Sequence, residues 1–120
     1  MASLTRESFD TPDETRPFEG KGQAQVVNIA GRAVGKAVFE PGWRWSNNIK
    51  PIAGTDSCQT SHLGYCISGR MKVYMDDGTE QEVGPGDVFA IHPGHDAETV
   101  GNEPCVALDF GEFGDYAKRH

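Results

Sequence analysis

Basic residues are few in this sequence of 120 residues, which has 11 lysines and arginines against 18 aspartates and glutamates and a formal net charge of −7. Nucleic acids and anionic membrane surfaces are bound by clustered Lys and Arg, so neither is expected as a partner. Long apolar runs are also missing, since none approaches the ~20 residues that span a bilayer. The first residues contain no apolar stretch typical of a secretory signal, and we therefore expect a cytoplasmic protein.

Cysteines and enzyme signatures are scarce too. Cys58, Cys66 and Cys105 are the three cysteines, an odd number without a CxxC pair. This count predicts no disulfide framework and is normal for a reducing compartment, and we expect Cys66 and Cys105 to be core residues. The sequence also lacks a GxSxG elbow, a P-loop and a dinucleotide fingerprint, so no catalytic residue is assigned from a motif.

Turn-forming residues, by contrast, are abundant, with 15 glycines and 7 prolines between short β-rich runs. Short strands joined by such turns are typical of an all-β sandwich or barrel. We predict a loop at Asn47–Asp56 and, for the apolar run Val88–His92, a strand buried on both faces. The predicted strands cover residues 23–29, 32–40, 57–68, 71–75, 80–83, 88–92 and 105–110.

Three regions are expected along the chain. Residues 1–22 are polar and contain Pro12 and Pro17, which disfavours a helix, and we interpret them as an extended N-terminal arm that is mobile or laid across a partner. Residues 23–114 form the β-barrel. Residues 115–120 form a C-terminal tail that adds at most one helical turn.

Two glycine-rich turns with their flanking strands resemble a known family. The run YCISGRMKV at residues 65–73 and the run GPGDVFAIHPG at residues 84–94 are similar to parts of the two sequence motifs of the cupin family. This resemblance covers residues 41–110 and implies a single cupin double-stranded β-helix, which is a small β-barrel or jelly roll. Cupins often form homodimers, so a homodimer is expected here as well.

The resemblance also points to the positions where cupins hold a metal ion. The family pattern has His-x-His, three or four residues and then Glu in the first motif, with a further His in the second. With a three-residue spacer these positions are Asp56, Cys58, His62 and Ala97, so the standard ligands are replaced. His95 lies two residues before Ala97 and can face the same way.

Asp56, Cys58, His62 and His95 are therefore the candidate ligands of a variant site, and a set with a thiolate and imidazoles suits zinc or iron. With a four-residue spacer Thr55 and Ser57 face inward instead and leave His62 alone, and the sequence leaves both registers open. The metal-free interpretation also stays open. In that case Cys58 is a small buried apolar residue, His62 a hydrogen-bonded core residue, Asp56 a turn residue and His95 part of a loop.

A ligand pocket is the second candidate site. Trp43 and Trp45 are two residues apart, which on a strand places both on one face, where they form an apolar wall for an organic ligand or simply fill the core. His62 and His92 complete the predicted pocket. For His92 we consider a ligand, a general base and a filler at the barrel mouth, and the filler is preferred.

Three function classes remain open on these observations. The first is a binding protein that holds a small organic molecule in the barrel, and the second is a metal-dependent cupin enzyme such as an oxygenase, isomerase or lyase. The third is an interaction protein whose N-terminal arm is exchanged with a neighbour. The fold alone does not choose between them, because one fold hosts many activities.

Overall fold

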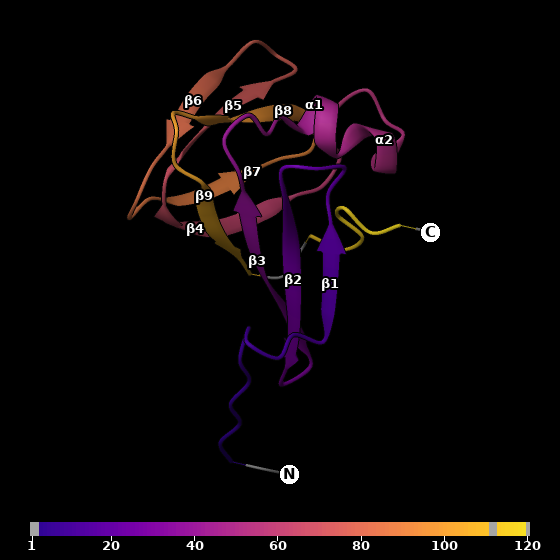
Figure 1. The fold of residues 1–120 in the computed structure, drawn as a ribbon, viewed down its shortest axis with the longest axis vertical. Helices are drawn as coiled ribbons and strands as arrows, with labels where there is room; N and C mark the ends of the chain where they lie inside the picture. Colours follow the sequence, from indigo (N-terminus) through magenta and orange to yellow (C-terminus); the bar gives the residue numbers. More distant parts are fainter. Residues whose placement is uncertain (1–2, 111–112, 120) are drawn as a thin grey trace.

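The computed structural model describes residues 3–110 and 113–119 and shows two antiparallel β-sheets that face each other (Figure 1). The larger sheet has the strand order β1-β2-β3-β9-β4-β7, and the smaller has the order β6-β5-β8. This arrangement confirms the predicted all-β class and the small barrel-like sandwich. The strands are β1 (Glu14–Pro17), β2 (Gly22–Ile29), β3 (Arg32–Phe39), β4 (His62–Ser68), β5 (Arg70–Met75), β6 (Glu80–Val83), β7 (Val88–Ile91), β8 (His95–Val100) and β9 (Cys105–Asp109).

Two of the predicted turns have the backbone that their residues favour. Ala30 and Gly31 connect β2 to β3 with φ angles of 49° and 76°, the left-handed pair that a two-residue hairpin turn needs. Gly69 carries the chain from β4 in one sheet to β5 in the other with a φ of 72°. A Cβ at this position would lie 2.1 Å from the carbonyl oxygen of Pro104, so only glycine fits.

Several strands differ from the prediction. The predicted strand at 57–68 begins only at His62, and the residues before it make a single isolated bridge between Cys58 and His95. β7 is not buried on both faces, because Val88 is 73% exposed and Ala90 is exposed too. β8 was not predicted, since its outward positions Asp96 and Glu98 interrupt the apolar pattern.

The predicted loop at Asn47–Asp56 contains two short helices instead, α1 (Trp45–Asn48) and α2 (Lys50–Ala53). Pro51 lies in the first turn of α2, where its missing N–H costs nothing. Gly54 ends this helix with a φ of 76°. Within residues 3–110 and 113–119, no helix has the length and apolar character required to cross a membrane.

Segments near both ends of the chain, at residues 14–18 and 113–117, pack onto the barrel. The expected arm at 1–22 contains β1, which pairs with β2, and Phe18 lies in the core. The buried Arg16 side chain donates hydrogen bonds to the carbonyl oxygens of Gly114 and Tyr116. The expected tail therefore contacts the first strand, and its residues 114–117 form a turn. Residues 1–2 of the arm, 111–112 of the predicted barrel and 120 of the tail lie outside the described residues.

The outer face of the larger sheet carries exposed apolar side chains at Leu63, Tyr65, Ile67 and Val88. These residues lie on β4 and on the neighbouring strand β7, where Tyr65 pairs with Val88. The homodimer stays a prediction that light scattering would test.

Candidate metal centre

Three potential metal ligands from three parts of the chain meet inside the barrel. The ligand atoms of Cys58, His62 and His95 all lie within 4.8 Å of one another. His62 and His95 are the first residues of β4 and β8, and Cys58 lies in the segment that leads into β4. Neighbouring ligands of a tetrahedral zinc ion are roughly 3.3–3.6 Å apart. The cluster therefore needs only small side-chain movements to surround one ion.

The backbone fixes Cys58 relative to His95. The amide N–H of Cys58 donates to the carbonyl oxygen of His95 at 2.7 Å, and the N–H of His95 donates back at 3.3 Å. The two residues are thus a hydrogen-bonded antiparallel pair, which keeps their Cα atoms about 5.5 Å apart. Their side chains leave the backbone on the same side and point to the same region.

Both imidazoles are oriented through the nitrogen that faces away from Cys58. The Nδ1 atom of His62 lies 2.6 Å from Oδ2 of Asp109, and its Nε2 atom lies 3.8 Å from Sγ of Cys58. The Nδ1–H of His95 donates to the carbonyl oxygen of His92 at 2.8 Å. Such hydrogen bonds to carboxylate or carbonyl oxygens are the usual support of metal-binding histidines, because they fix the ring and leave Nε2 for the ion.

The strand that carries His95 is held in place from its outer side. Arg44 forms ion pairs with Asp96 and Glu98, each at 3.1 Å, and these acidic residues alternate with the inward-facing residues of β8. The N–H of Thr99 also donates to the carbonyl oxygen of Trp43. The segment before α1 thus anchors β8 and determines which of its side chains enter the barrel.

The cluster favours a thiolate even though it is buried. Burial alone raises the pKa of the Cys58 thiol, but the hydrogen bonds and positive charge of His62 and His95 outweigh this effect and lower the pKa to about 6. Burial lowers the pKa of His62, yet its contacts with Asp109 and Cys58 raise it to about 9. Cys58 and His62 therefore form a thiolate–imidazolium pair, and the thiolate is the form in which cysteine binds metals.

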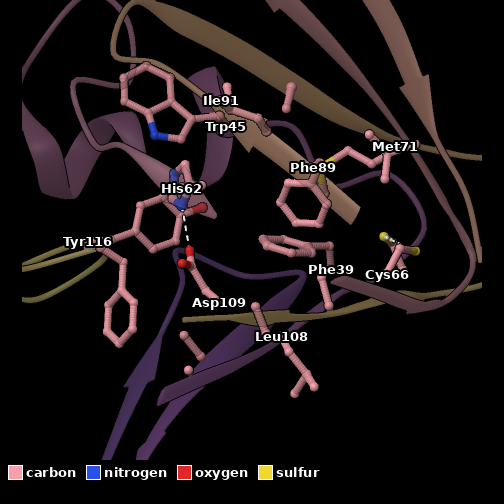
Figure 2. A pocket seen from close by; sticks show the side chains of 18 of the residues that line it. Phe39, Trp45, His62, Cys66, Met71, Phe89, Ile91, Leu108, Asp109 and Tyr116 are labelled. Carbon is pink, nitrogen blue, oxygen red and sulfur yellow. Dashed lines mark hydrogen bonds and ion pairs between the residues drawn. The ribbon is translucent and has the colours of Figure 1, made fainter. Parts of the chain in front are cut away.

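The two histidines border a narrow cavity of about 70 Å³ (Figure 2). Its walls come from both sheets and are mostly apolar, with Val73, Phe89 and Ile91 among the lining residues. Tyr116 from the C-terminal segment closes one side, and its ring meets that of His62 edge-on with the centroids 5.0 Å apart. Cys58 lines a second, neighbouring cavity together with Trp45 and Tyr116. The cluster thus stands between two cavities.

Not every predicted site residue reaches this region. Asp56 does not join the cluster, because its fully exposed side chain points to solvent beside Lys50, 3.9 Å away. The prediction assumed a continuous strand from residue 57, and the chain bends there instead. His92 is exposed and does not line the cavity, since it follows β7 on the outward side. Its contribution is its backbone carbonyl, which orients His95.

Trp43 and Trp45 do line the cavity, and both are 2% exposed. They do not sit on one strand face as predicted, because Trp45 begins α1. Phe39 packs against Trp43 with their ring centroids 4.4 Å apart. The role of the two indoles in binding a ligand stays a prediction.

Sequence reasoning missed two residues that the structure brings to the cluster, Asp109 and Tyr116. A signal was present for Asp109, since it is the acidic residue at the end of the apolar strand Cys105–Asp109 and shares the inward parity of Cys105 and Ala107. Tyr116 has no such signal, because it reaches His62 through the fold of the C-terminal segment.

Comparisons with known proteins agree with this architecture. A family model described as a cupin domain matches residues 56–111, the stretch that contains the cluster ligands and both glycine turns. This chain carries a cupin domain. The resemblance read from the two turn motifs is thereby confirmed. No curated protein matches the chain in sequence.

Solved structures show the same fold at low sequence identity. The polyketide cyclase RemF from Streptomyces resistomycificus is 18% identical with a TM-score of 0.63, over 90% of this chain and 78% of that one. KdgF from Halomonas sp. is 19% identical with a TM-score of 0.60, over 85% of this chain and 90% of that one. A variant of Bacillus subtilis oxalate decarboxylase is 18% identical with a TM-score of 0.64, over 95% of this chain and 31% of that one.

The cluster partly coincides with the metal positions of the cupin motif. With the three-residue spacer considered above, the resemblance puts Cys58 and His62 at positions where cupins have a His and a Glu, and Ala97 at the position of the last His. His95 lies on the same inward face of β8 as Ala97, one inward position earlier. The donor set of this cupin domain is therefore one sulfur and two nitrogen atoms, which suits zinc or iron(II) far better than magnesium or calcium.

Proposed function

We propose that this cupin domain holds one divalent transition-metal ion on Cys58, His62 and His95 and presents it to a small organic ligand in the adjoining cavity. Zinc fits the donor set best, and iron(II) is the next choice. The observation that carries the proposal is the convergence of three ligand atoms within 4.8 Å, with each imidazole oriented through its other nitrogen.

Three protein ligands leave one position of a tetrahedral ion free. Catalytic zinc sites have this form, whereas structural zinc sites use four protein ligands. In this chain His62 and His95 line the cavity, so a ligand in the cavity would lie beside the two imidazoles that would hold the ion. A bound ion would supply Lewis-acid chemistry there.

The chain's own residues prepare the site for binding. Asp109 accepts a hydrogen bond from the Nδ1–H group of His62 and so keeps Nε2 of His62 directed at the cluster. Cys58 is already a thiolate near neutral pH. The walls of the cavity are mostly apolar, and such surroundings strengthen the electrostatic interactions of a bound molecule.

Elemental analysis of the purified, tag-free protein tests the proposal. We expect about one zinc or iron ion per chain, and we expect the His62→Ala variant to lose it. The His92→Ala variant is the matched control, because its side chain is exposed and outside the cluster, and it should keep the ion. Wild-type protein that takes up no ion when supplied with zinc or iron(II) would contradict the proposal and favour a metal-free pocket for an organic ligand.

A further inference from the structure

The two sheets of the barrel differ in what their outer faces present. On the smaller sheet the outward positions carry charged side chains, since Lys72 on β5 is paired in register with Glu82 on β6 and with Glu98 on β8. Polar residues on the outer face are the usual pattern of an antiparallel sheet that packs only its inner face on a core. The outer face of the smaller sheet is therefore suited to contact with water.

The outer face of the larger sheet is apolar over three neighbouring strands. The outward positions of β4, β9 and β7 contain no charged residue, and their apolar members are Leu63, Tyr65, Ile67, Val106, Leu108, Val88 and Ala90. The strand register places Leu108, Tyr65 and Val88 side by side in one row. An antiparallel sheet with apolar residues on both faces is expected to be covered on both.

This face also gathers most of the large apolar side chains that solvent reaches. Leu63, Tyr65, Ile67, Val88 and Phe110 are 38–73% exposed, and the N–H of Phe110 donates to the carbonyl oxygen of Leu63. Within residues 3–110 and 113–119, Leu4 is the one other large apolar side chain that is exposed. Single exposed apolar residues are normal, but a contiguous patch marks an interaction surface.

The area of the patch suits a pair of copies. With ~150–200 Å² for each whole side chain, the five exposed residues leave on the order of 400 Å² of apolar surface uncovered. An interface of standard size takes ~800 Å² from each partner, and ~65% of it is apolar in homodimers. The five side chains thus supply most of the apolar area that one partner of a stable dimer contributes.

The distribution of charge favours a second copy of the chain as the occupant. Each chain has a formal net charge of −7, so two copies repel one another. The two sheets of one barrel face each other (Figure 1), so contact between two larger sheets leaves the charged smaller sheets on the outside of the pair. A basic partner would instead be attracted to the acidic side chains of the smaller sheet.

We propose that the outer face of β4, β9 and β7 is the interface of a two-fold homodimer, with Tyr65 and Val88 near its centre. In such an interface the same patch of each copy meets itself. The proposal goes beyond the proposed function and does not require a metal ion.

Sedimentation equilibrium of the full-length protein tests the interface. We expect a wild-type dimer with a Kd of about 10 μM or lower. Leu63→Lys and Val88→Lys should each raise the Kd at least about 100-fold, because a lysine would be buried there without a partner. Leu4→Lys is the matched control, because it makes the same change at an exposed leucine outside the patch, and it should leave the Kd unchanged.

Each substitution to lysine makes the net charge less negative, so a loss of the dimer cannot result from stronger overall repulsion. Wild-type protein that is monomeric at about 100 μM would overturn the proposal. Dimers that persist in both patch variants would place the interface elsewhere, and a dimer that Leu4→Lys dissociates would assign it to the N-terminal arm. Wild-type protein also provides a test without any variant. Its Kd should fall as NaCl rises from about 0.05 to 0.5 M, because salt screens the repulsion between the two acidic chains, and a Kd that rises would contradict an uncharged interface.

Discussion

The two ends of the barrel interior both contain buried cysteines, but the pKa of the thiol is lowered at one end and raised at the other. Cys58 at one end and Cys66 and Cys105 at the other are all buried. Burial raises the pKa of Cys105 to about 12, and it raises that of Cys66 as well. The pKa of Cys58 is lowered to about 6 instead. The neighbours of a buried thiol, and not its burial, therefore decide whether its pKa is raised or lowered.

Those neighbours differ in a simple way. Cys66 and Cys105 face each other with their Sγ atoms 4.0 Å apart, in a region lined by apolar side chains such as Met71. Each of the two thiols has the other as a partner, Cys66 also donates to the carbonyl oxygens of Ser68 and Gly69, and no cation among the described residues affects the pKa of either. Cys58 has two imidazoles, one of which is held by a carboxylate.

The largest effect is expected from replacing the thiol at each end in turn. Cys58→Ser should lower zinc affinity by at least about 100-fold, because a serine hydroxyl is a poor ligand compared with a thiolate. Cys66→Ser, the matched change at the apolar end, should leave zinc affinity unchanged while it lowers the melting temperature. Competition with a zinc indicator dye measures the zinc affinity of both variants, and thermal unfolding measures their melting temperatures. Equal loss of affinity in the two variants would show that the ends do not differ as described.

A smaller effect is expected from the carboxylate that orients His62. Asp109→Asn keeps the shape of the side chain but removes the charge, so it should weaken zinc binding about 10–100-fold without abolishing it. Zinc affinity from the same competition assay, compared with that of His62→Ala, checks the order of the two effects. An Asp109→Asn variant that binds zinc as tightly as wild type would exclude a supporting role for Asp109.

The turns and the cluster also show how much of the structure the sequence alone could predict. The fold followed from turn chemistry, because Gly69 and the Ala30-Gly31 pair have the positive φ angles that their positions require. Cys58, His62 and His95 were candidates because the resemblance to the cupin motifs points to these positions or to a neighbouring one. Strand parity failed for Asp56 because the chain bends at residues 55–57 and β4 begins only at His62, and parity has no meaning outside a strand.

The sequence alone could not predict which distant segments contact one another. Asp109 lies 47 residues from His62, and Tyr116 reaches the same ring through a turn of the C-terminal segment. Arg16 secures that segment from the other end of the chain. Such contacts depend on the three-dimensional packing, and no local pattern records them.

The smallest effect concerns alkaline stability at the apolar end. The pKa of Cys105 is about 12 in the folded protein, above the ordinary thiol value, so the unfolded chain loses its proton first as the pH rises. The stabilisation is fully present below about pH 9 and is lost as the pH approaches 12. Urea unfolding at pH 8 and pH 10.5 should show a decrease in the free energy of unfolding that is smaller in Cys105→Ala. Identical decreases in both proteins would contradict this prediction.

The paired backbone hydrogen bonds between Cys58 and His95 have a consequence for the uptake of the proposed metal ion. In small zinc domains the ion provides the free energy of folding, and its removal unfolds the chain. Here two of the three ligands are held by the strand pairing itself, and the barrel has its own apolar core. A chelator should therefore leave a folded protein that reloads without refolding. The ion would then be an exchangeable component, and the occupied fraction would follow the metal concentration around the protein.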